Sequence, residues 1–239
     1  MYFTYISRKQ LGKGAVFLLC LIILWLGFLG VYQNKNVPVS DELAYKPIYQ
    51  GDINKKNMAL TFNIDWGEEF IDDIIDILQK EQVTATFYPT GKWAAKFPDK
   101  IKLIHENGHE LGNHGYSHPH VNQLSLEENK QEIIKTELIL KEICGVKTQL
   151  YAPPYGEDKP HVMQAAEELG YKVVFWTIDT VDWKKEVTVA QIHNKVLGKA
   201  QNGAIVLMHP TANTVTALPE MIKGLKDKGF SLSSVSDIL

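Results

Sequence analysis

The chain has 239 residues, of which 45% are hydrophobic and 22% are charged, and its formal net charge is −3. This length accommodates one sizeable domain and an additional segment. The slightly acidic balance lacks the basic surface with which proteins bind nucleic acid, so we expect no nucleic-acid partner.

An uncharged apolar run occupies residues 15–32, and Arg8, Lys9 and Lys13 precede it. A run of this length crosses a bilayer when flanking residues help, and basic residues before it keep the N-terminus in the cytoplasm. We therefore predict a cytoplasmic segment at 1–14, a transmembrane helix at 15–32, and an extracytoplasmic remainder held at the cell membrane by this single pass. A cleaved signal peptide is the alternative, but no small-residue cleavage site follows the run.

Residues 33–56 are polar, contain Pro38 and Pro47, and show no apolar period, which is typical of a stalk. From residue 57 to 239, strand patterns alternate with helix patterns. We expect strands near 58–65, 84–90, 109–114, 148–154, 171–179, 203–209 and 230–235, and helices near 68–82, 98–108, 126–144, 160–169, 188–200 and 216–228. This alternation predicts an α/β fold with a parallel sheet and outer helices, either as a barrel or as an open sheet.

The polar residues of this region cluster at or just after the predicted strand ends. They are Asn63, Asp65, His114, His118, Tyr155, Asp179, Asp182 and His209. Ligand sites of parallel α/β folds gather at the carboxyl ends of strands. His114 and His118 are also one helical turn apart, a spacing that presents two imidazoles to one cation but also arises by chance. The pattern indicates a binding site at this rim.

Five stretches of the domain at 57–239 resemble, in order, the motifs of the polysaccharide deacetylases (NodB homology domain, carbohydrate esterase family 4). They are TFNIDWG at 61–67, HGYSH at 114–118, APPYG at 152–156, DTVDW at 179–183 and LMH at 207–209. The resemblance implies a distorted (β/α)7 barrel, which agrees with the alternation above. It is strongest to membrane-anchored and sporulation-associated members from Gram-positive bacteria.

The resemblance implies a divalent metal ion, zinc in the first instance, bound by Asp65, His114 and His118. It implies a hydrolase that removes N-acetyl groups from N-acetylglucosamine units of a cell-envelope polysaccharide, breaking a carbon–nitrogen bond that is not a peptide bond. His209 would protonate the departing amine, and Asp182 would hold the imidazole. Asp65 would serve the catalytic step as well as the metal.

The same resemblance places Tyr155, Trp183 and Leu207 in the substrate groove, with a main-chain N–H near Tyr155 facing the oxyanion. The residues alone do not separate Asp179 from Asp182 as the partner of His209.

The sequence departs from the family pattern at two positions. Asn63 stands where the family has its aspartate base, and Ala152 stands where an arginine orients that base. An amide cannot accept a proton at useful pH. A second alignment fixes Gly67, makes Asp65 the base, and puts Trp66 at the ligand position. We expect either a deacetylase of reduced activity or a metal-binding, glycan-recognising relative that acts in envelope or spore assembly.

Overall fold

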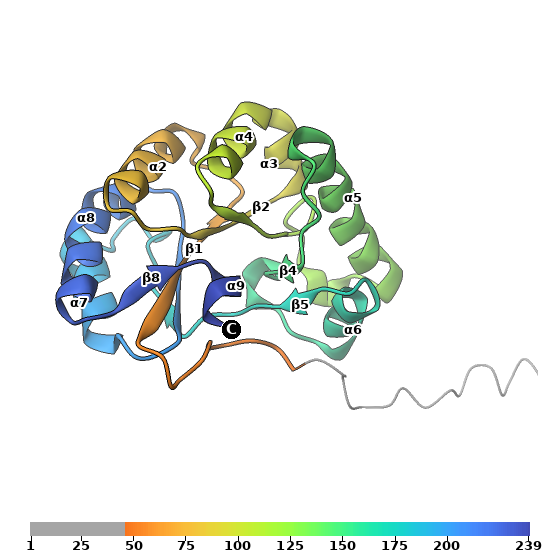
Figure 1. The fold of residues 1–239 in the computed structure, drawn as a ribbon. Helices are drawn as coiled ribbons and strands as arrows, with labels where there is room; N and C mark the ends of the chain where they lie inside the picture. The colour runs from red at the N-terminus through yellow and green to blue at the C-terminus, as the bar shows by residue number, and fades with distance from the viewer. Residues whose placement is uncertain (1–45) are drawn as a thin grey trace, which may run out of the picture. The chain divides into compact units, whose positions relative to one another are not determined.

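The structure is a computed structural model that describes residues 46–239, which form an α/β domain of parallel strands covered by helices (Figure 1). The predicted cytoplasmic segment, transmembrane helix and most of the stalk lie outside the described residues. Within 46–239, no helix combines the length and apolar character needed to cross a membrane.

The sheet is built around β1 (Asn57–Ile64), whose eight residues are all buried. Parallel neighbours flank it: β2 (Thr86–Pro89) along its second half, β7 (Ala204–Met208) along most of its length, and β8 (Ser231–Ser233) at its start. The strand β3 (Glu110–Leu111) extends the sheet beyond β2, and β6 (Ile178–Asp179) extends it beyond β7. The predicted parallel sheet is confirmed.

A second parallel pair, β4 (Leu150–Tyr151) with β5 (Lys172–Val173), is connected to this sheet by single bridges. Asn113 bridges to Tyr151, Ile48 bridges to Val174, and Gln50 bridges to Ala204. These pairings carry the strands around a common interior, in agreement with a distorted barrel.

Side-chain alternation along β1 explains why its sequence is almost continuously apolar. Met58, Leu60, Phe62 and Ile64 belong to the large core beneath the helices, whereas Ala59 belongs to a smaller apolar cluster. Asn63 lies on the same face as Ala59, four residues further along the strand. Because β1 ends at Ile64, the Asn63 side chain stands at the carboxyl end of the sheet.

The helices lie outside the strands (Figure 1). They are α2 (Ile71–Lys80), α3 (Gly91–Lys96), α4 (Pro98–Glu106), α5 (Leu126–Cys144), α6 (Pro160–Glu168), α7 (Val189–Lys199), α8 (Ala212–Asp227) and the short α9 (Val235–Ile238). Capping boxes start α5 at Ser125 and α7 at Thr188, because each hydroxyl accepts from the backbone three residues on.

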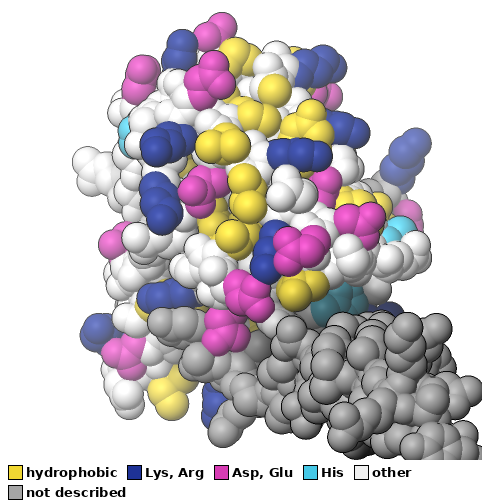
Figure 2. Space-filling view, turned by 90° about the vertical axis from the view of Figure 1, so that its right-hand side faces the viewer, with side chains coloured by type: hydrophobic (Ala, Val, Ile, Leu, Met, Phe, Trp, Pro, Cys, Tyr) yellow, Lys and Arg dark blue, Asp and Glu magenta, His cyan; other side chains and the backbone are white. Residues whose placement is uncertain are grey.

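Figure 2 views the side of the domain on which α5 lies, where hydrophobic side chains are interspersed with charged ones. A shallow hollow between α4 and α5 is lined by Pro98, Lys102, Ile139, Glu142 and Ile143, together with Ala95. None of these residues borders the cleft described below.

The predicted stalk ends earlier than residue 56. Ile48 accepts from the N–H of Phe175 at 2.7 Å and donates to Val173 at 2.8 Å, and Gly51 donates to Gly203 at 2.8 Å. This part of the prediction was wrong because the stretch is too short to show a period and is held by partners more than a hundred residues away.

Candidate functional site

A cleft of about 480 Å³ opens at the carboxyl ends of β1, β6 and β7. Most of the predicted site residues border it, namely Asn63, Asp65, His114, His118, Tyr155, Asp179, Trp183, Leu207 and His209. Trp66, Gly156 and Trp176 also border it and were not among the predicted site residues. The fold thus gathers five separate sequence motifs around one cavity.

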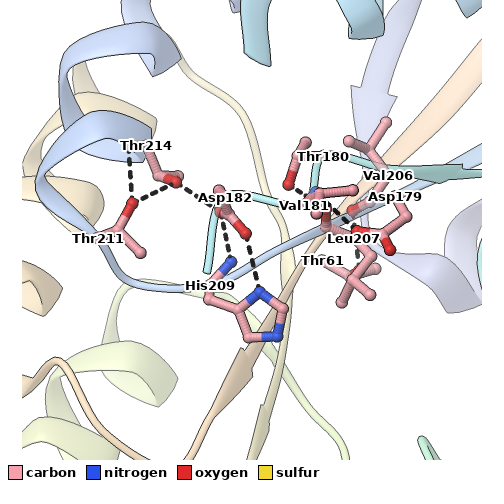
Figure 3. Close-up of polar contacts among 10 residues, drawn as sticks. All are labelled: Thr61, Asp179, Thr180, Val181, Asp182, Val206, Leu207, His209, Thr211 and Thr214. Carbon is pink, nitrogen blue, oxygen red and sulfur yellow. Dashed lines mark hydrogen bonds and ion pairs between the residues drawn. The ribbon is translucent and has the colours of Figure 1, made fainter. Parts of the chain in front are cut away.

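His209 borders the cleft and forms two hydrogen bonds with Asp182, which lies buried behind it and does not border the cleft (Figure 3). The main-chain N–H of His209 donates to Oδ2 of Asp182 at 2.7 Å, and the ring Nδ1 donates to Oδ1 at 2.9 Å. The Asp182 side chain is fully buried, and the His209 side chain remains partly exposed. Because Nδ1 is committed to the carboxylate, Nε2 is the ring nitrogen left for a ligand.

Asp182 is itself held by the first turn of α8 (Figure 3). The hydroxyl of Thr214 donates to its Oδ2 at 2.5 Å, and Thr211, which caps α8, donates to Thr214 at 2.9 Å. A buried carboxylate requires such partners, since an unpaired charge in this position would be strongly destabilising.

Asp179 has a different partner, because its carboxylate accepts from the N–H of Val181 at 2.8 Å. Val181 has a φ of 60°. This left-handed conformation is rare for a β-branched residue, and such strain concentrates at functional sites. Asp182, and not Asp179, is therefore the partner of His209.

The two histidines of the HGYSH stretch lie on a loop and not on a helix. Gly115 and His118 both have positive φ, 73° and 53° respectively, which excludes a regular helical turn. The expectation of a shared helical face was therefore wrong in its geometry. The rings still meet, with centroids 4.9 Å apart.

His114 is held in the neutral form that binds a metal ion. Its Nδ1 donates to the main-chain carbonyl of Ala152 at 2.6 Å, which leaves the lone pair on Nε2. Burial, reinforced by the neighbouring His118, lowers the pKa of His114 to about 3. Burial also lowers the pKa of His118, although the nearby carboxylate of Asp65 opposes that shift.

Asp65 follows β1 and borders the same cleft, where its carboxylate accepts from the hydroxyl of Thr90 at 2.9 Å. Across residues 46–239, no three His, Cys, Asp or Glu side chains converge closely enough to form a complete metal-binding group. The ligand set of Asp65, His114 and His118 therefore stays a prediction. The donor chemistry of the two histidines fits a divalent cation, because both are neutral and one is anchored through Nδ1.

The two departures from the family pattern are both buried. Asn63 is 6% exposed, and its side-chain amide forms no hydrogen bond with another described residue. Ala152 is 5% exposed and belongs to an apolar cluster with Tyr88 and Val174, against which Trp176 packs. An apolar cluster thus occupies the position where the family pattern has an arginine.

Exposed aromatic rings surround the mouth of the cleft. Trp66, Tyr155 and Trp183 are 43%, 58% and 53% exposed. Trp66 lies parallel to His209, with an interplanar angle of 5° and ring centroids 6.1 Å apart. Tyr155, at a φ of 60°, stacks on His120 at 4.2 Å. Aromatic rings left in water beside polar side chains are typical of a binding surface.

The position of Trp66 depends on the next residue, Gly67, which has a φ of 84°. A β-carbon on Gly67 would lie 2.3 Å from the carbonyl oxygen of Pro210, so only glycine fits. This contact fixes Trp66 relative to His209, the neighbour of Pro210. The sequence placed Trp66 only at the ligand position of the second alignment, because its place beside His209 depends on this tertiary contact.

The chain is similar in sequence and fold to several described proteins. The sequence model of the family described as polysaccharide deacetylase matches residues 50–174. A peptidoglycan-N-acetylglucosamine deacetylase of Bacillus cereus is 40% identical over 77% of this chain and 69% of its own length. The uncharacterized protein YlxY of Bacillus subtilis is 37% identical over 83% of this chain, which spans only 62% of that relative.

Among solved structures, a CE4 family pseudoenzyme from Bacillus anthracis is 36% identical, with a TM-score of 0.79 over 82% of this chain and 69% of that chain. A mutant of the same pseudoenzyme, described as having restored enzymatic activity, matches with the same TM-score at 35% identity and covers 72% of its own chain.

Proposed function

Because the chain belongs to the polysaccharide deacetylase family, whose members are hydrolases acting on carbon–nitrogen bonds, we propose a function for its cleft. The cleft binds an N-acetylglucosamine-containing polysaccharide of the cell envelope and slowly hydrolyses its N-acetyl groups. The observation that carries this proposal is the bonded pair of His209 and buried Asp182, in one cleft with the neutral histidines His114 and His118.

His209 acts on the leaving group of the reaction, the sugar amine. Hydrolysis adds water to the acetyl carbon, breaks the amide C–N bond, and releases acetate and the sugar amine. An amine leaves readily only if its nitrogen receives a proton, and Nε2 of His209 is the group available to donate it. Asp182 stabilises the protonated ring, because its carboxylate accepts from Nδ1 at 2.9 Å.

His114 and His118, with Asp65 as the third ligand, would hold a divalent ion. When bound, such an ion lowers the pKa of water and polarises the amide carbonyl. The chain itself contributes a neutral, preoriented imidazole at His114, since the Ala152 carbonyl fixes its tautomer. The main-chain N–H at Tyr155, in its left-handed conformation, serves the oxyanion.

The cleft lacks the aspartate that the family pattern uses as general base for the attacking water. We therefore propose a slow rate of hydrolysis. Asn63 has no group that accepts a proton, and the apolar cluster around Ala152 supplies no cation to orient one. In the alternative alignment Asp65 serves as the base, and its carboxylate beside His118 is compatible with that role.

A second candidate function is glycan recognition without turnover, in envelope or spore assembly. Asn63 and Ala152 favour it, as does the 36% identity to a protein described as a CE4 family pseudoenzyme. The exposed rings of Trp66, Tyr155 and Trp183 serve sugar binding under either function.

Acetate release from chitotetraose and from purified peptidoglycan separates the two candidates. The full chain, stripped with chelator and reloaded with zinc, is compared with its His209→Ala variant. Slow release that His209→Ala diminishes supports the deacetylase. Binding of chitotetraose with no acetate released from either protein supports recognition alone, and absence of both binding and release contradicts the proposed substrate.

We also propose that residues 15–32 anchor the chain in the cell membrane, with the domain outside the cytoplasm. The uncharged run and the basic residues before it support this arrangement.

A further inference from the structure

Glu132, in the middle of α5, is bonded to the loop that carries the two histidines. Its Oε2 accepts from the consecutive main-chain N–H groups of Tyr116 at 2.9 Å and Ser117 at 2.7 Å. The Ser117 hydroxyl also donates to Oε1 at 3.1 Å. One carboxylate thus satisfies three donors between His114 and His118.

Consecutive N–H groups that converge on one oxygen form a concavity that binds anions, and here the anion is a side chain of the same protein. A charged acceptor makes such bonds shorter and stronger than a neutral one does. Without Glu132, the donors of Tyr116 and Ser117 would be left without a protein partner in a partly buried position.

The other side of the loop is tied to α3. The N–H of Gly91 donates to the carbonyl of Gly115 at 3.0 Å, and that of Lys92 donates to Tyr116 at 2.9 Å. These bonds hold the loop's carbonyls but leave its N–H groups to Glu132. The loop is therefore clamped between two helices, one on each side.

His118 comes directly after this clamp and has a φ of 53°, in the left-handed region that is uncommon for residues other than glycine, although histidine enters it more often than most. The bonds to Tyr116 and Ser117 fix the backbone up to the residue before it. The left-handed turn then sends the His118 ring toward His114, and it also lies edge-on to Tyr155 at 4.6 Å.

We propose that Glu132 is a positioning residue, which holds the His118 ring beside His114 so that both nitrogens serve one cation. The part that concerns the cation rests on the proposed function above, whereas the part that concerns the ring does not. The HGYSH stretch does not reveal this role, because Glu132 lies fourteen residues beyond His118 on a helix whose sequence is typical of an ordinary charged surface.

The test uses the full chain with Glu132→Ala and Glu132→Gln, the second of which keeps one acceptor oxygen. The matched control is Glu142→Ala, an exposed glutamate on the same helix. Zinc affinity is measured by calorimetry, and the ring signals of His118 and His209 are followed by NMR in metal-free protein. Loss of a partner that orients a ligand typically weakens metal binding by about 10- to 100-fold.

We expect zinc affinity to fall in the order wild type, Glu132→Gln, Glu132→Ala, while Glu142→Ala matches wild type. In metal-free protein, the His118 signals should shift or broaden in Glu132→Ala and the His209 signals should not. Unchanged His118 signals in Glu132→Ala overturn the proposal. If wild type binds no zinc, the metal part of the proposed function fails, and the His118 signals alone decide the role of Glu132.

If Glu132→Ala does not fold, the same two measurements on Glu132→Gln decide the matter, with wild-type values contradicting the proposal.

Discussion

Asp182 accepts two hydrogen bonds from His209, one from its main-chain N–H and one from its ring. A single carboxylate therefore fixes both the place of the residue and the tautomer of the imidazole. Because Thr214 donates to the same carboxylate, the pair is anchored to α8. Under the proposed function, the chain thus supplies both the proton donor and the carboxylate that orients it.

Replacing Asp182 by asparagine should lower the rate of acetate release by about a hundredfold or more, the scale of a general acid's contribution. An amide can accept from His209, but it cannot stabilise the protonated ring with a negative charge. The comparison is kcat on chitotetraose, with Asp179→Asn as the matched control. The amide oxygen introduced by Asp179→Asn could still accept from Val181, so a loss as large as that of Asp182→Asn would contradict the division of roles between the two aspartates.

Because of His109, the free energy of unfolding of the domain should decrease as the pH falls. His109 is buried, its Nδ1 accepts from the N–H of Ala85, and burial lowers its pKa from 6.5 to about 4. Between these two pH values the unfolded chain binds a proton that the folded domain excludes. The contribution of His109 is therefore full above pH 6.5 and is lost as pH falls toward 4, with a slope of up to about 1.4 kcal/mol per pH unit.

Urea unfolding at several pH values between 7 and 4.5 measures this slope in wild type and in His109→Gln. The variant should have a shallower dependence of the free energy of unfolding on pH. Identical slopes would mean that other groups account for the acid sensitivity.

Trp66→Ala should weaken binding of chitotetraose, because Trp66 presents a fixed ring beside His209. A stacking contact of about 0.5–1.5 kcal/mol corresponds to a loss of roughly two- to tenfold in affinity. Tyr49→Ala is the control, since Tyr49 is 50% exposed but does not border the cleft. Calorimetry that finds equal affinities for the two variants would remove Trp66 from the binding surface.

Protease added to intact protoplasts should remove the domain, if residues 15–32 anchor it outside the cytoplasmic membrane. A cytoplasmic protein serves as the control for protoplast integrity. Isolation of a soluble mature form that begins near Gln33 would establish a cleaved signal instead.

The sequence predicted the elements that have a strong local signal. The strand at β1 follows from its apolar run, and α5 and α7 follow from the helical spacing of their apolar residues. The strands β3, β4 and β5 are only two residues long and depend on pairing with distant segments. Local patterns therefore indicated where they lie but not how far they extend.

The residues of the site also divide into those with a local sequence signal and those that depend on distant contacts. The order and spacing of the five motifs carry a signal in the sequence, and this signal identified most of the residues that border the cleft. Glu132 acts on the histidine loop from another helix, and Trp66 depends on the contact between Gly67 and Pro210. Both effects arise from tertiary contacts, so local spacing does not reveal them.

Under the proposed function, His209 with Asp182 donates the proton, whereas Asn63 and Ala152 stand where the family pattern has an aspartate base and its arginine. The single substitution Ala152→Arg should lower the free energy of unfolding. Ala152 lies in an apolar cluster, and a lone guanidinium there would lack a partner. Asn63→Asp together with Ala152→Arg should be more stable than the sum of the single variants predicts, since each supplies the charge that the other needs.

Acetate release from chitotetraose by zinc-loaded wild type, the two single variants and the double variant decides whether the missing base limits the rate. We predict a slow wild type and a double variant faster by about a hundredfold to ten-thousandfold, the usual contribution of a positioned base. Wild-type turnover at ordinary enzyme rates, about 1 per second or more, would contradict this division of the cleft and identify Asp65 as the base.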